Sequence, residues 1–593
     1  MAERTVSDLM VERLRAWGVE RIYGYSGDGI NGFLEALNRA EDGPRFVQAR
    51  HEENAAFMAV GHAKYGGGVG VVTSTQGPGA VHLLNGLYDA KLDGVPVVAI
   101  VGQQNRSVLG SGYMQEINLL TLFADVAAQY AVQVSAPEQL PMALDRAFRT
   151  ALATRSPAVV IVPHDVQKAA APELKAEHGI VVTAPGYRPG EVQPQADDLQ
   201  VAADILNSGE RVALLVGQGA RHARDEVVAV AERLGAGITT SLLGKPYVDE
   251  TLPYAAGTMG HLGTTASAHL LGTCDTLLIV GSNDPWTEFY PQPGQARAVQ
   301  IDLDGRYLGN RYPVEVGLVG DAARTLSSLL GLLAERAETP WRDEVERHVT
   351  EWREIAERRA MVPADPVNPE RVLRELDRQL PPNARVAVDV GSVVYWYARQ
   401  VRVPQGVPVH LSSTLASMGC GVPYGIAAKL GAPDRPVIVL SGDGGFQMTG
   451  IAELVTVSRL WREWADPRFV VCVLNNGDLA EVTWEQREME GEPRFPASQA
   501  LPEFPYAEYA ELLGLRGERV EDPDQLAAAW ERALGADRPV LLEVRTDASI
   551  PLLPPFPGGA AKLDTMRGAL DEEGTPDSDR ARRLLDEYAS HEE

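Results

Sequence analysis

The sequence predicts an α/β protein built from three doubly wound parallel-sheet domains. Its 593 residues exceed what one hydrophobic core supports, so several domains are expected. Short apolar runs that end in glycine-rich loops, each followed by a segment with helical periodicity, recur around residues 22–33, 212–225 and 437–460. This alternation of strand and helix is typical of parallel sheets covered by helices on both faces.

Two segments divide the chain. Residues 163–194, rich in proline, alanine and glycine, are interpreted as a linker, and residues 334–365 as a charged helical connector before a boundary near 363–369. The charged C-terminal tail is expected to be a mobile or surface segment. The expected divisions are three domains and a tail: residues 1–175, 195–335, 366–550 and 551–593.

Composition excludes several classes of partner. A formal net charge of −27 and a pI near 4.9 argue against nucleic acids and anionic membranes, which select basic surfaces. The cysteines, Cys274, Cys420 and Cys472, have no zinc or disulfide spacing, which fits a reducing cytoplasm. The N-terminus lacks the apolar core of a signal peptide, and no apolar run approaches the roughly 20 residues that span a bilayer. We therefore expect a cytoplasmic protein without a membrane span.

The stretch over residues 437–479 carries the strongest chemical signal. An apolar run ends in Ser-Gly-Asp-Gly-Gly, a helical segment follows, and a second apolar run ends in Asn-Asn. A right-handed crossover makes the two strands parallel neighbours, so Asp443 and Asn476 are expected at the same edge of one sheet. Their oxygens, with a backbone carbonyl near Asp478, suit Mg²⁺ that bridges to a diphosphate. A plain strand-to-helix turn is the alternative for the glycine motif alone.

Gly-Asp-Gly followed after about thirty residues by Asn-Asn resembles the diphosphate-binding signature of thiamine diphosphate enzymes, and the resemblance extends over residues 5–565. Two departures are Ala480, in place of the usual glycine, and Trp484, one place earlier than the tryptophan of acetolactate synthases. The resemblance implies Asp443, Asn476 and Asp478 as metal ligands. The implied contacts to the diphosphate come from Asp443, Gly444, Gly445, Asn476, Gly477, Asp478, Leu479, Ala480, Glu481 and Val482.

Glu52 is the implied catalytic acid. It opens a helix of small residues in His-Glu-Glu-Asn-Ala-Ala, where paired acids commonly complement the helix dipole on a solvated face. The family's glutamate in Glu-x-x-Ala-Ala hydrogen-bonds the pyrimidine of the cofactor. A buried carboxyl there favours the imino tautomer, which takes the proton from the thiazolium C2. The resemblance therefore implies that Glu52 binds the cofactor and starts its proton relay.

Two further segments are implied to face the cofactor. Within Ala416-Ser417-Met418, Met418 matches the bulky apolar residue that bends the cofactor, although a methionine is most often core filler. Gln115 lies in a polar loop whose counterpart faces the substrate, with a solvated loop as the alternative. This loop is most similar to the pyruvate oxidase branch, which has an aromatic residue where this chain has Met114. The adjacent histidines of pyruvate decarboxylases are absent from it.

The middle domain carries three glycine-rich or acidic strand ends within about fifty residues. Such ends place backbone amides and carboxylates around a dinucleotide, although ordinary turns are the alternative. The run GSNDPWTEFYP followed by QIDLD resembles the FAD domain of the pyruvate oxidase branch and of acetolactate synthase. The implied FAD contacts are Met259, Gly260, His261, Leu262, Gly281, Ser282, Asn283, Asp284, Pro285 and Asp302.

The resemblance implies oxidative decarboxylation of a small 2-oxo acid, with pyruvate first, using thiamine diphosphate, Mg²⁺ and FAD. Oxygen or a quinone would be the final electron acceptor. The alternatives are carboligation as in acetolactate synthase, non-oxidative decarboxylation with an empty middle domain, and a non-catalytic nucleotide-binding or scaffold protein. In this family the two halves of the site meet between subunits, so we expect a homodimer or homotetramer.

Overall fold

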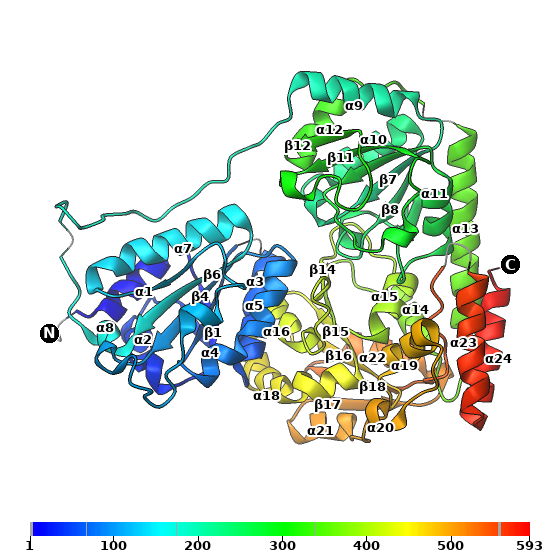
Figure 1. The fold of residues 1–593 in the computed structure, drawn as a ribbon. Helices are drawn as coiled ribbons and strands as arrows, with labels where there is room; N and C mark the ends of the chain where they lie inside the picture. Colours follow the sequence, from blue (N-terminus) through cyan, green and yellow to red (C-terminus); the bar gives the residue numbers. More distant parts are fainter. Residues whose placement is uncertain (1–3, 67, 174, 337–338, 556–558, 593) are drawn as a thin grey trace.

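The computed structural model describes residues 4–66, 68–173, 175–336, 339–555 and 559–592. It contains three α/β units, each with its own six-stranded parallel sheet between helices (Figure 1). This confirms the predicted fold class. Among the described helices, none combines the length and the apolar character needed to cross a membrane.

The first unit has the strand order β2-β1-β3-β4-β6-β5. Strands β3, β4 and β6 are buried throughout, as their continuous apolar runs predict. The edge strand β5 was not predicted, because its three residues are too few to show a pattern. The strands are β1 (Arg21–Gly24), β2 (Arg45–Gln48), β3 (Gly70–Ser74), β4 (Val97–Gln103), β5 (Ala131–Gln133) and β6 (Pro157–Pro163). The helices are α1 (Val6–Ala16), α2 (Asn31–Arg39), α3 (Glu52–Gly66), α4 (Pro78–His82), α5 (Leu84–Leu92), α6 (Leu119–Leu122), α7 (Leu140–Thr154) and α8 (His164–Lys168).

A long segment without regular structure leads from α8 to the second unit (Figure 1). The linker predicted over residues 163–194 begins too early, because Pro163 ends β6 and residues 164–168 form α8. The second sheet has the order β12-β11-β10-β7-β8-β9. Its strands are β7 (Val212–Val216), β8 (Gly237–Thr240), β9 (Ala255–Thr258), β10 (Thr276–Val280), β11 (Arg297–Asp302) and β12 (Val316–Val319). The helices are α9 (Ala196–Ser208), α10 (Arg224–Leu234), α11 (Thr265–Thr273), α12 (Ala322–Leu330) and the long connector α13 (Pro340–Ala360).

The third sheet has the order β14-β13-β15-β16-β18-β17. Strands β15 and β16 pair in parallel from Val437 opposite Phe469 to Gly442 opposite Leu474, so the predicted crossover is confirmed. The strands are β13 (Arg385–Val388), β14 (Val409–His410), β15 (Val437–Gly442), β16 (Phe469–Asn475), β17 (Arg516–Val520) and β18 (Val540–Arg545). The helices are α14 (Pro369–Gln379), α15 (Ser392–Gln400), α16 (Gly421–Gly431), α17 (Asp443–Gly445), α18 (Ile451–Leu460), α19 (Ala480–Glu485), α20 (Pro496–Gln499), α21 (Tyr506–Leu512) and α22 (Leu526–Leu534).

The first and third units share one hydrophobic core where α3 lies against α16. Gly61 permits this approach, because a Cβ there would lie 3.1 Å from the Cβ of Ala427 and 3.2 Å from the Cα of Tyr424. The buried Lys64 ammonium lies 2.6 Å from Asp93, which pairs its charge inside the same contact. The two units that carry the predicted cofactor residues are thus held together within one chain.

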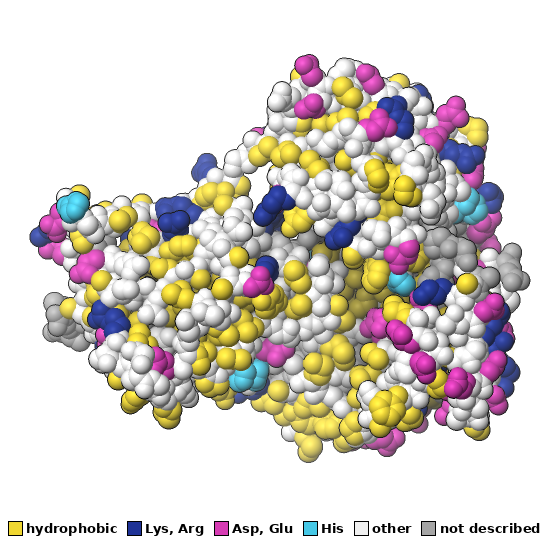
Figure 2. Space-filling view, viewed as in Figure 1, with side chains coloured by type: hydrophobic (Ala, Val, Ile, Leu, Met, Phe, Trp, Pro, Cys, Tyr) yellow, Lys and Arg dark blue, Asp and Glu magenta, His cyan; other side chains and the backbone are white. Residues whose placement is uncertain are grey.

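The C-terminal tail is helical. It folds into two packed helices, α23 (Ala560–Glu573) and α24 (Pro576–Ser590), beside α13 and the third unit (Figure 1). Leu584, Leu585 and Tyr588 form a buried stripe on α24, and Arg487 forms a buried ion pair with Glu573 at 2.7 Å. Figure 2 shows charged side chains of both signs over this region. Of the two expected forms, a mobile or a surface segment, the structure shows a folded surface segment, because these charges mask a narrow apolar face at helical spacing.

Candidate active site

The carboxylate of Asp443 lies at the end of β15 and is almost completely buried. Its Oδ1 accepts the backbone N–H of Gly444 at 2.9 Å, and its Oδ2 accepts that of Gly477 at 2.7 Å. Burial raises its pKa to about 6. A divalent cation at this carboxylate would offset the cost of keeping a negative charge out of water, so the residue fits a metal ligand.

Asn476 follows β16 beside Asp443, and its Oδ1 accepts the N–H of Asp478 at 2.9 Å. The Asp478 side chain is already engaged, since Arg494 lies 2.6 Å from its Oδ1 and the Thr483 hydroxyl donates to its Oδ2 at 2.7 Å. Only the backbone carbonyl of Asp478 is therefore suited to a metal. Gly477 has a φ of +67°, which lets the loop turn back toward Asp443.

An apolar wall covers the turn after β15. A Cβ on Gly444 would lie 2.7 Å from Leu479 Cδ2 and 3.0 Å from Met418 Cε, so these side chains meet directly above the glycine. Ala416 has the left-handed φ of +55°, which is unusual for a residue with a side chain. Ser417 Oγ accepts a hydrogen bond from Asn85 of the first unit at 2.8 Å. The structure thus brings Met418 to the predicted diphosphate site.

Asp389 was missed by the sequence analysis. It lies just after β13, is buried, and accepts the Gly419 N–H at 2.7 Å and the Ser441 hydroxyl at 3.0 Å. Burial raises its pKa to about 6. A Cβ on Gly445 would lie 2.8 Å from its carboxyl, so it ties the Met418 loop to the glycine turn. Its position at a strand end before a glycine was the available signal.

Helix α19 carries a pair of acids at the rim of this region. Glu481 and Glu485 are one turn apart, and burial followed by the charge of Glu485 raises the pKa of Glu481 to about 8. A Cβ on Gly391 would lie 4.0 Å from Glu481 Oε2, so Glu481 faces the start of α15. Ala480 is buried, whereas Val482 is 47% exposed. Glu485 was not among the predicted site residues.

Glu52 opens α3 and is 8% exposed, so it does not lie on a solvated face. Its Oε2 lies 2.9 Å from Nδ1 of His82 on α4, which the sequence analysis missed. Glu453 of the third unit accepts the N–H of Arg50 at 2.6 Å and the amide of Asn54 at 3.0 Å. These bonds hold the start of α3 on both sides of Glu52.

Gln115 lies in the same unit and adopts a φ of +62°. The Oε1 of Gln115 accepts a hydrogen bond from the side-chain amide of Gln76 at 3.1 Å. A Cβ on Gly77 would lie 2.8 Å from the Cβ of Gln115. The substrate loop therefore packs on the Gln-Gly-Pro-Gly turn that precedes α4 and His82. This places Gln115 next to the elements around Glu52, and Gln76 is a second neighbour that the sequence analysis did not identify.

In the second unit the predicted flavin residues gather at strand ends. Ser282 Oγ and Asn283 Oδ1 after β10, with the hydroxyls of Thr240 on β8 and Thr258 on β9, are buried without hydrogen-bond partners. Buried polar atoms are rarely left unpaired, so these oxygens fit contacts to a bound polar ligand. The residues present are therefore compatible with a dinucleotide such as FAD.

The loop after β9 packs against the ring of Trp286. Gly260 has a φ of +84°, and a Cβ there would lie 2.6 Å from the Trp286 ring. His261 lies 2.9 Å from Glu288, while Met259 is buried and Leu262 packs against the third unit.

The other predicted flavin residues lie at the ends of β10 and β11. Gly281 has a positive φ, and Pro285 is exposed. Asp302 Oδ1 accepts the N–H of Asp304 at 2.9 Å.

Asp284 predicts a pH dependence of stability. Burial raises its pKa to about 7, so between about pH 4 and pH 7 the folded state binds more protons than the unfolded state, and stability falls as pH rises through this window. We expect Asp284→Asn to stabilise the cofactor-free protein by at most about 4 kcal/mol above pH 7 and by about 2 kcal/mol at pH 5. Asparagine keeps an oxygen for the Trp286 N–H, which Oδ1 accepts at 3.2 Å.

The measurement is chemical denaturation from pH 5 to pH 8, with the exposed Asp434→Asn as the matched control. A difference between Asp284→Asn and wild type that does not grow with pH would contradict this role for Asp284.

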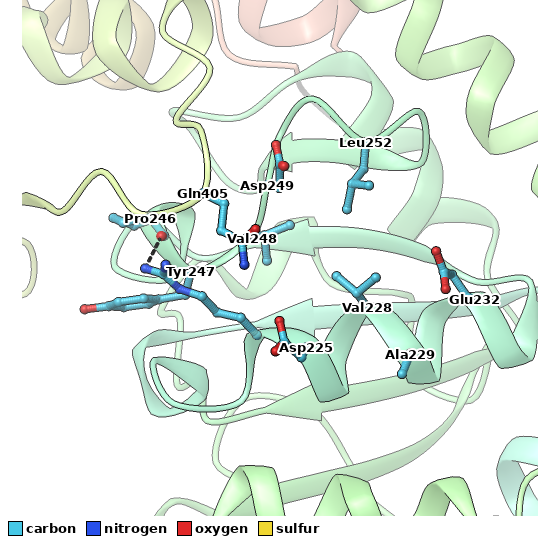
Figure 3. A pocket seen from close by; sticks show the side chains of 11 residues that line it. Asp225, Val228, Ala229, Glu232, Pro246, Tyr247, Val248, Asp249, Leu252 and Gln405 are labelled. Carbon is cyan, nitrogen blue, oxygen red and sulfur yellow. Dashed lines mark hydrogen bonds between the residues drawn. The ribbon is translucent and has the colours of Figure 1, made fainter. Parts of the chain in front are cut away.

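A cavity of about 280 Å³ lies elsewhere in the second unit, against Gln405 of the third (Figure 3). Asp225, Glu232 and Asp249 contribute carboxylates to its lining, and its arginine, Arg224, donates to the carbonyl of Pro246 at 2.9 Å. Three acids around one engaged arginine disfavour a diphosphate. We therefore do not assign this cavity to either cofactor.

Three parallel-sheet units, with the buried Asp443 beside Asn476 at one sheet edge, are the arrangement expected of an α/β enzyme that binds a diphosphate cofactor. Three domain families match the chain: thiamine pyrophosphate enzyme N-terminal TPP binding domain at residues 4–122, central domain at 199–329 and C-terminal TPP binding domain at 389–544. The chain belongs to the thiamine pyrophosphate enzymes, within the superfamily of pyruvate oxidase and acetolactate synthase.

Relatives match along almost the whole chain. The protein YdaP of Bacillus subtilis is 36% identical over 558 residues, which is 94% of each chain. Pyruvate oxidase of Lactiplantibacillus plantarum is 30% identical, covering 94% of this chain and 90% of the relative. Acetolactate synthase isozyme 2 large subunit of Escherichia coli is also 30% identical, covering 94% and 98%. These matches confirm the family resemblance. They do not distinguish pyruvate oxidase from acetolactate synthase, because both relatives are 30% identical.

Proposed function

We propose that this enzyme decarboxylates a small 2-oxo acid, pyruvate first, with thiamine diphosphate and Mg²⁺, and that FAD receives the electrons. The observation that carries the proposal is the buried Asp443 carboxylate beside Asn476 at the ends of two paired strands. We also propose the domain limits 1–175, 195–335 and 366–550, and a cytoplasmic location.

The third unit would hold the charged end of the cofactor. Asp443, Asn476 and the carbonyl of Asp478 would bind Mg²⁺, and the backbone after Gly444 would bind the diphosphate. Met418 and Leu479 would hold the cofactor bent and keep water away from its reactive carbon. Thiamine diphosphate, when bound, supplies a carbon that adds to the keto group and accepts the electron pair released with CO₂.

The first unit would supply the acid. Glu52 Oε2 is held by His82, which leaves Oε1, near Gly79, for the pyrimidine end of the cofactor. In this arrangement Glu52 holds a proton at the pyrimidine nitrogen and His82 keeps the carboxyl in place. Gln115, on the neighbouring loop, would orient the substrate.

The second unit would bind FAD, which accepts two electrons when bound. The unpaired buried oxygens of Ser282, Asn283, Thr240 and Thr258 support this assignment. Oxygen or a quinone would then reoxidise the flavin. The chain's residues here bind and position, and no proton transfer is assigned to them.

The test of the oxidase assignment is the absorption spectrum of the purified protein before and after pyruvate is added without oxygen. We expect a flavin spectrum that bleaches with release of CO₂. The equal identity to acetolactate synthase makes carboligation the second candidate, for which the flavin stays oxidised and an acetohydroxy acid forms. A colourless protein that still releases CO₂ would show a non-oxidative decarboxylase and contradict the oxidase proposal.

We further propose that the active site forms between two copies of the chain. Large apolar side chains are exposed beside both halves of the site: Val81, next to His82, is 45% exposed, and Met448, just after the glycine turn, is 59% exposed. Figure 2 shows hydrophobic side chains on the surface of the first and third units. Met114 in the substrate loop is 69% exposed. A homodimer would cover these surfaces, and a tetramer is the larger alternative.

A further inference from the structure

We propose that His269, Glu344 and His348 form a binding site for a divalent transition-metal ion of the zinc type, on the seam between α11 and the connector helix α13. The site lies in the second unit and uses none of the residues assigned to thiamine diphosphate, Mg²⁺ or FAD. It is independent of the proposed reaction.

The three side chains converge from two helices. Glu344 and His348 are four residues apart on α13, so they share one face of that helix. His269 comes from α11, and its Nε2 lies 2.9 Å from Glu344 Oε1. The imidazole rings of His269 and His348 have centroids 3.6 Å apart. One potential ligand atom from each of the three residues lies within 4.8 Å of the others.

The ligand types select the metal. Two imidazoles and a carboxylate suit Zn²⁺, Co²⁺ or Ni²⁺ better than Mg²⁺ or Ca²⁺, which prefer oxygen ligands. Three protein ligands leave the fourth position of a zinc ion to water. The side chains of His269, Glu344 and His348 are 26%, 30% and 23% exposed, so the ion can reach them from solvent.

Two charged neighbours contact His348, one that would orient it toward the ion and one that would have to move. Glu351 Oε2 lies 2.9 Å from Nδ1 of His348, and a carboxylate there orients a ligating imidazole so that Nε2 faces the ion. Arg347 lies 3.3 Å from this Nε2 and would move away when the metal binds. The Arg347 side chain is 56% exposed, so it can turn into solvent.

A metal here would join α11 to α13. The two helices already pack together, and α13 leads from the second unit to the third. An ion bound only by the folded form stabilises that form. We therefore infer that the ion fastens the connector helix to the second unit.

The experiment titrates the full-length protein, freed of transition metals with a chelator and then saturated with thiamine diphosphate and Mg²⁺. Zn²⁺ binding is followed by calorimetry, and Co²⁺ binding by its visible absorption. A second cluster, His51, Glu52 and His82, belongs to the candidate active site and can also bind metal. The comparison between variants therefore matters more than the total number of ions.

The variants are His348→Ala, His269→Ala and the nearly isosteric Glu344→Gln. We expect each to weaken one Zn²⁺ site by about tenfold or more and to remove its Co²⁺ absorption. The matched control Glu354→Gln, an exposed acid on the same helix, should bind as wild type does. If wild type and all three ligand variants bind the same number of ions with the same affinities, the proposal is wrong. Thermal unfolding without metal checks that each variant is folded.

Discussion

Replacing Asp443 with alanine is expected to abolish the stabilisation of this protein by thiamine diphosphate and Mg²⁺, together with its catalytic activity. The carboxylate is buried at the end of β15, and both its oxygens face loop amides. Without it, Asn476 and a carbonyl near Asp478 are the remaining proposed metal ligands, and neither carries the charge that offsets Mg²⁺. A ligand at a hundredfold excess over its Kd stabilises by about 2.7 kcal/mol, and this gain should disappear.

The measurement is thermal unfolding of wild type and variant with and without both ligands. Asp434→Ala is the matched control, because this aspartate is exposed shortly before β15. Its ligand-dependent shift should equal that of wild type. The cofactor-free Asp443→Ala protein should still unfold cooperatively, which separates loss of the site from loss of the fold. An unchanged ligand-dependent shift in Asp443→Ala would remove the metal role of this residue.

The sequence predicts the approach of Asp443 and Asn476 well, because it depends on strands that are neighbours along the chain. Two apolar runs joined by one helix usually lie parallel and adjacent, so the approach of Asp443 and Asn476 is the arrangement that chain order and the handedness of crossovers favour. The burial of Glu52 is different. Acids at a helix start commonly face water, and Glu52 is buried here because α4 supplies His82 and the third unit contacts its helix.

Residues whose roles depend on distant partners were not predicted. His82 reaches Glu52 from 30 positions away and leaves no local pattern. Asp389 binds a loop 30 positions on, so its place at a strand end indicates its position but not its partner. The C-terminal helices were missed for another reason. The buried stripe of Leu584, Leu585 and Tyr588 is short. The average composition of the tail is dominated by charged residues, and such a composition predicts an unfolded segment.

Replacing Glu52 with glutamine is expected to lower kcat by about 10²–10⁴-fold while thiamine diphosphate still binds. Glutamine keeps the size of the side chain and can accept a hydrogen bond from His82, but it has no acidic proton for the pyrimidine. Cofactor affinity, measured by the same unfolding assay, should change little because the diphosphate end is held by the third unit. The adjacent Glu53→Gln, whose carboxylate accepts from Asn85 at 2.6 Å, is the matched control.

Glu52→Gln also tests where the active site forms. The described hydrogen bonds of Glu52 lie in the first unit and those of Asp443 in the third. If the site joins these units from different copies, unfolding and refolding an equimolar mixture of Glu52→Gln and Asp443→Ala chains creates mixed dimers with one intact site and one doubly altered site. Random pairing makes half of the dimers mixed, so activity should recover to about one quarter of wild type. A site built within one chain would give no recovery, because every copy then carries one lesion in its own site.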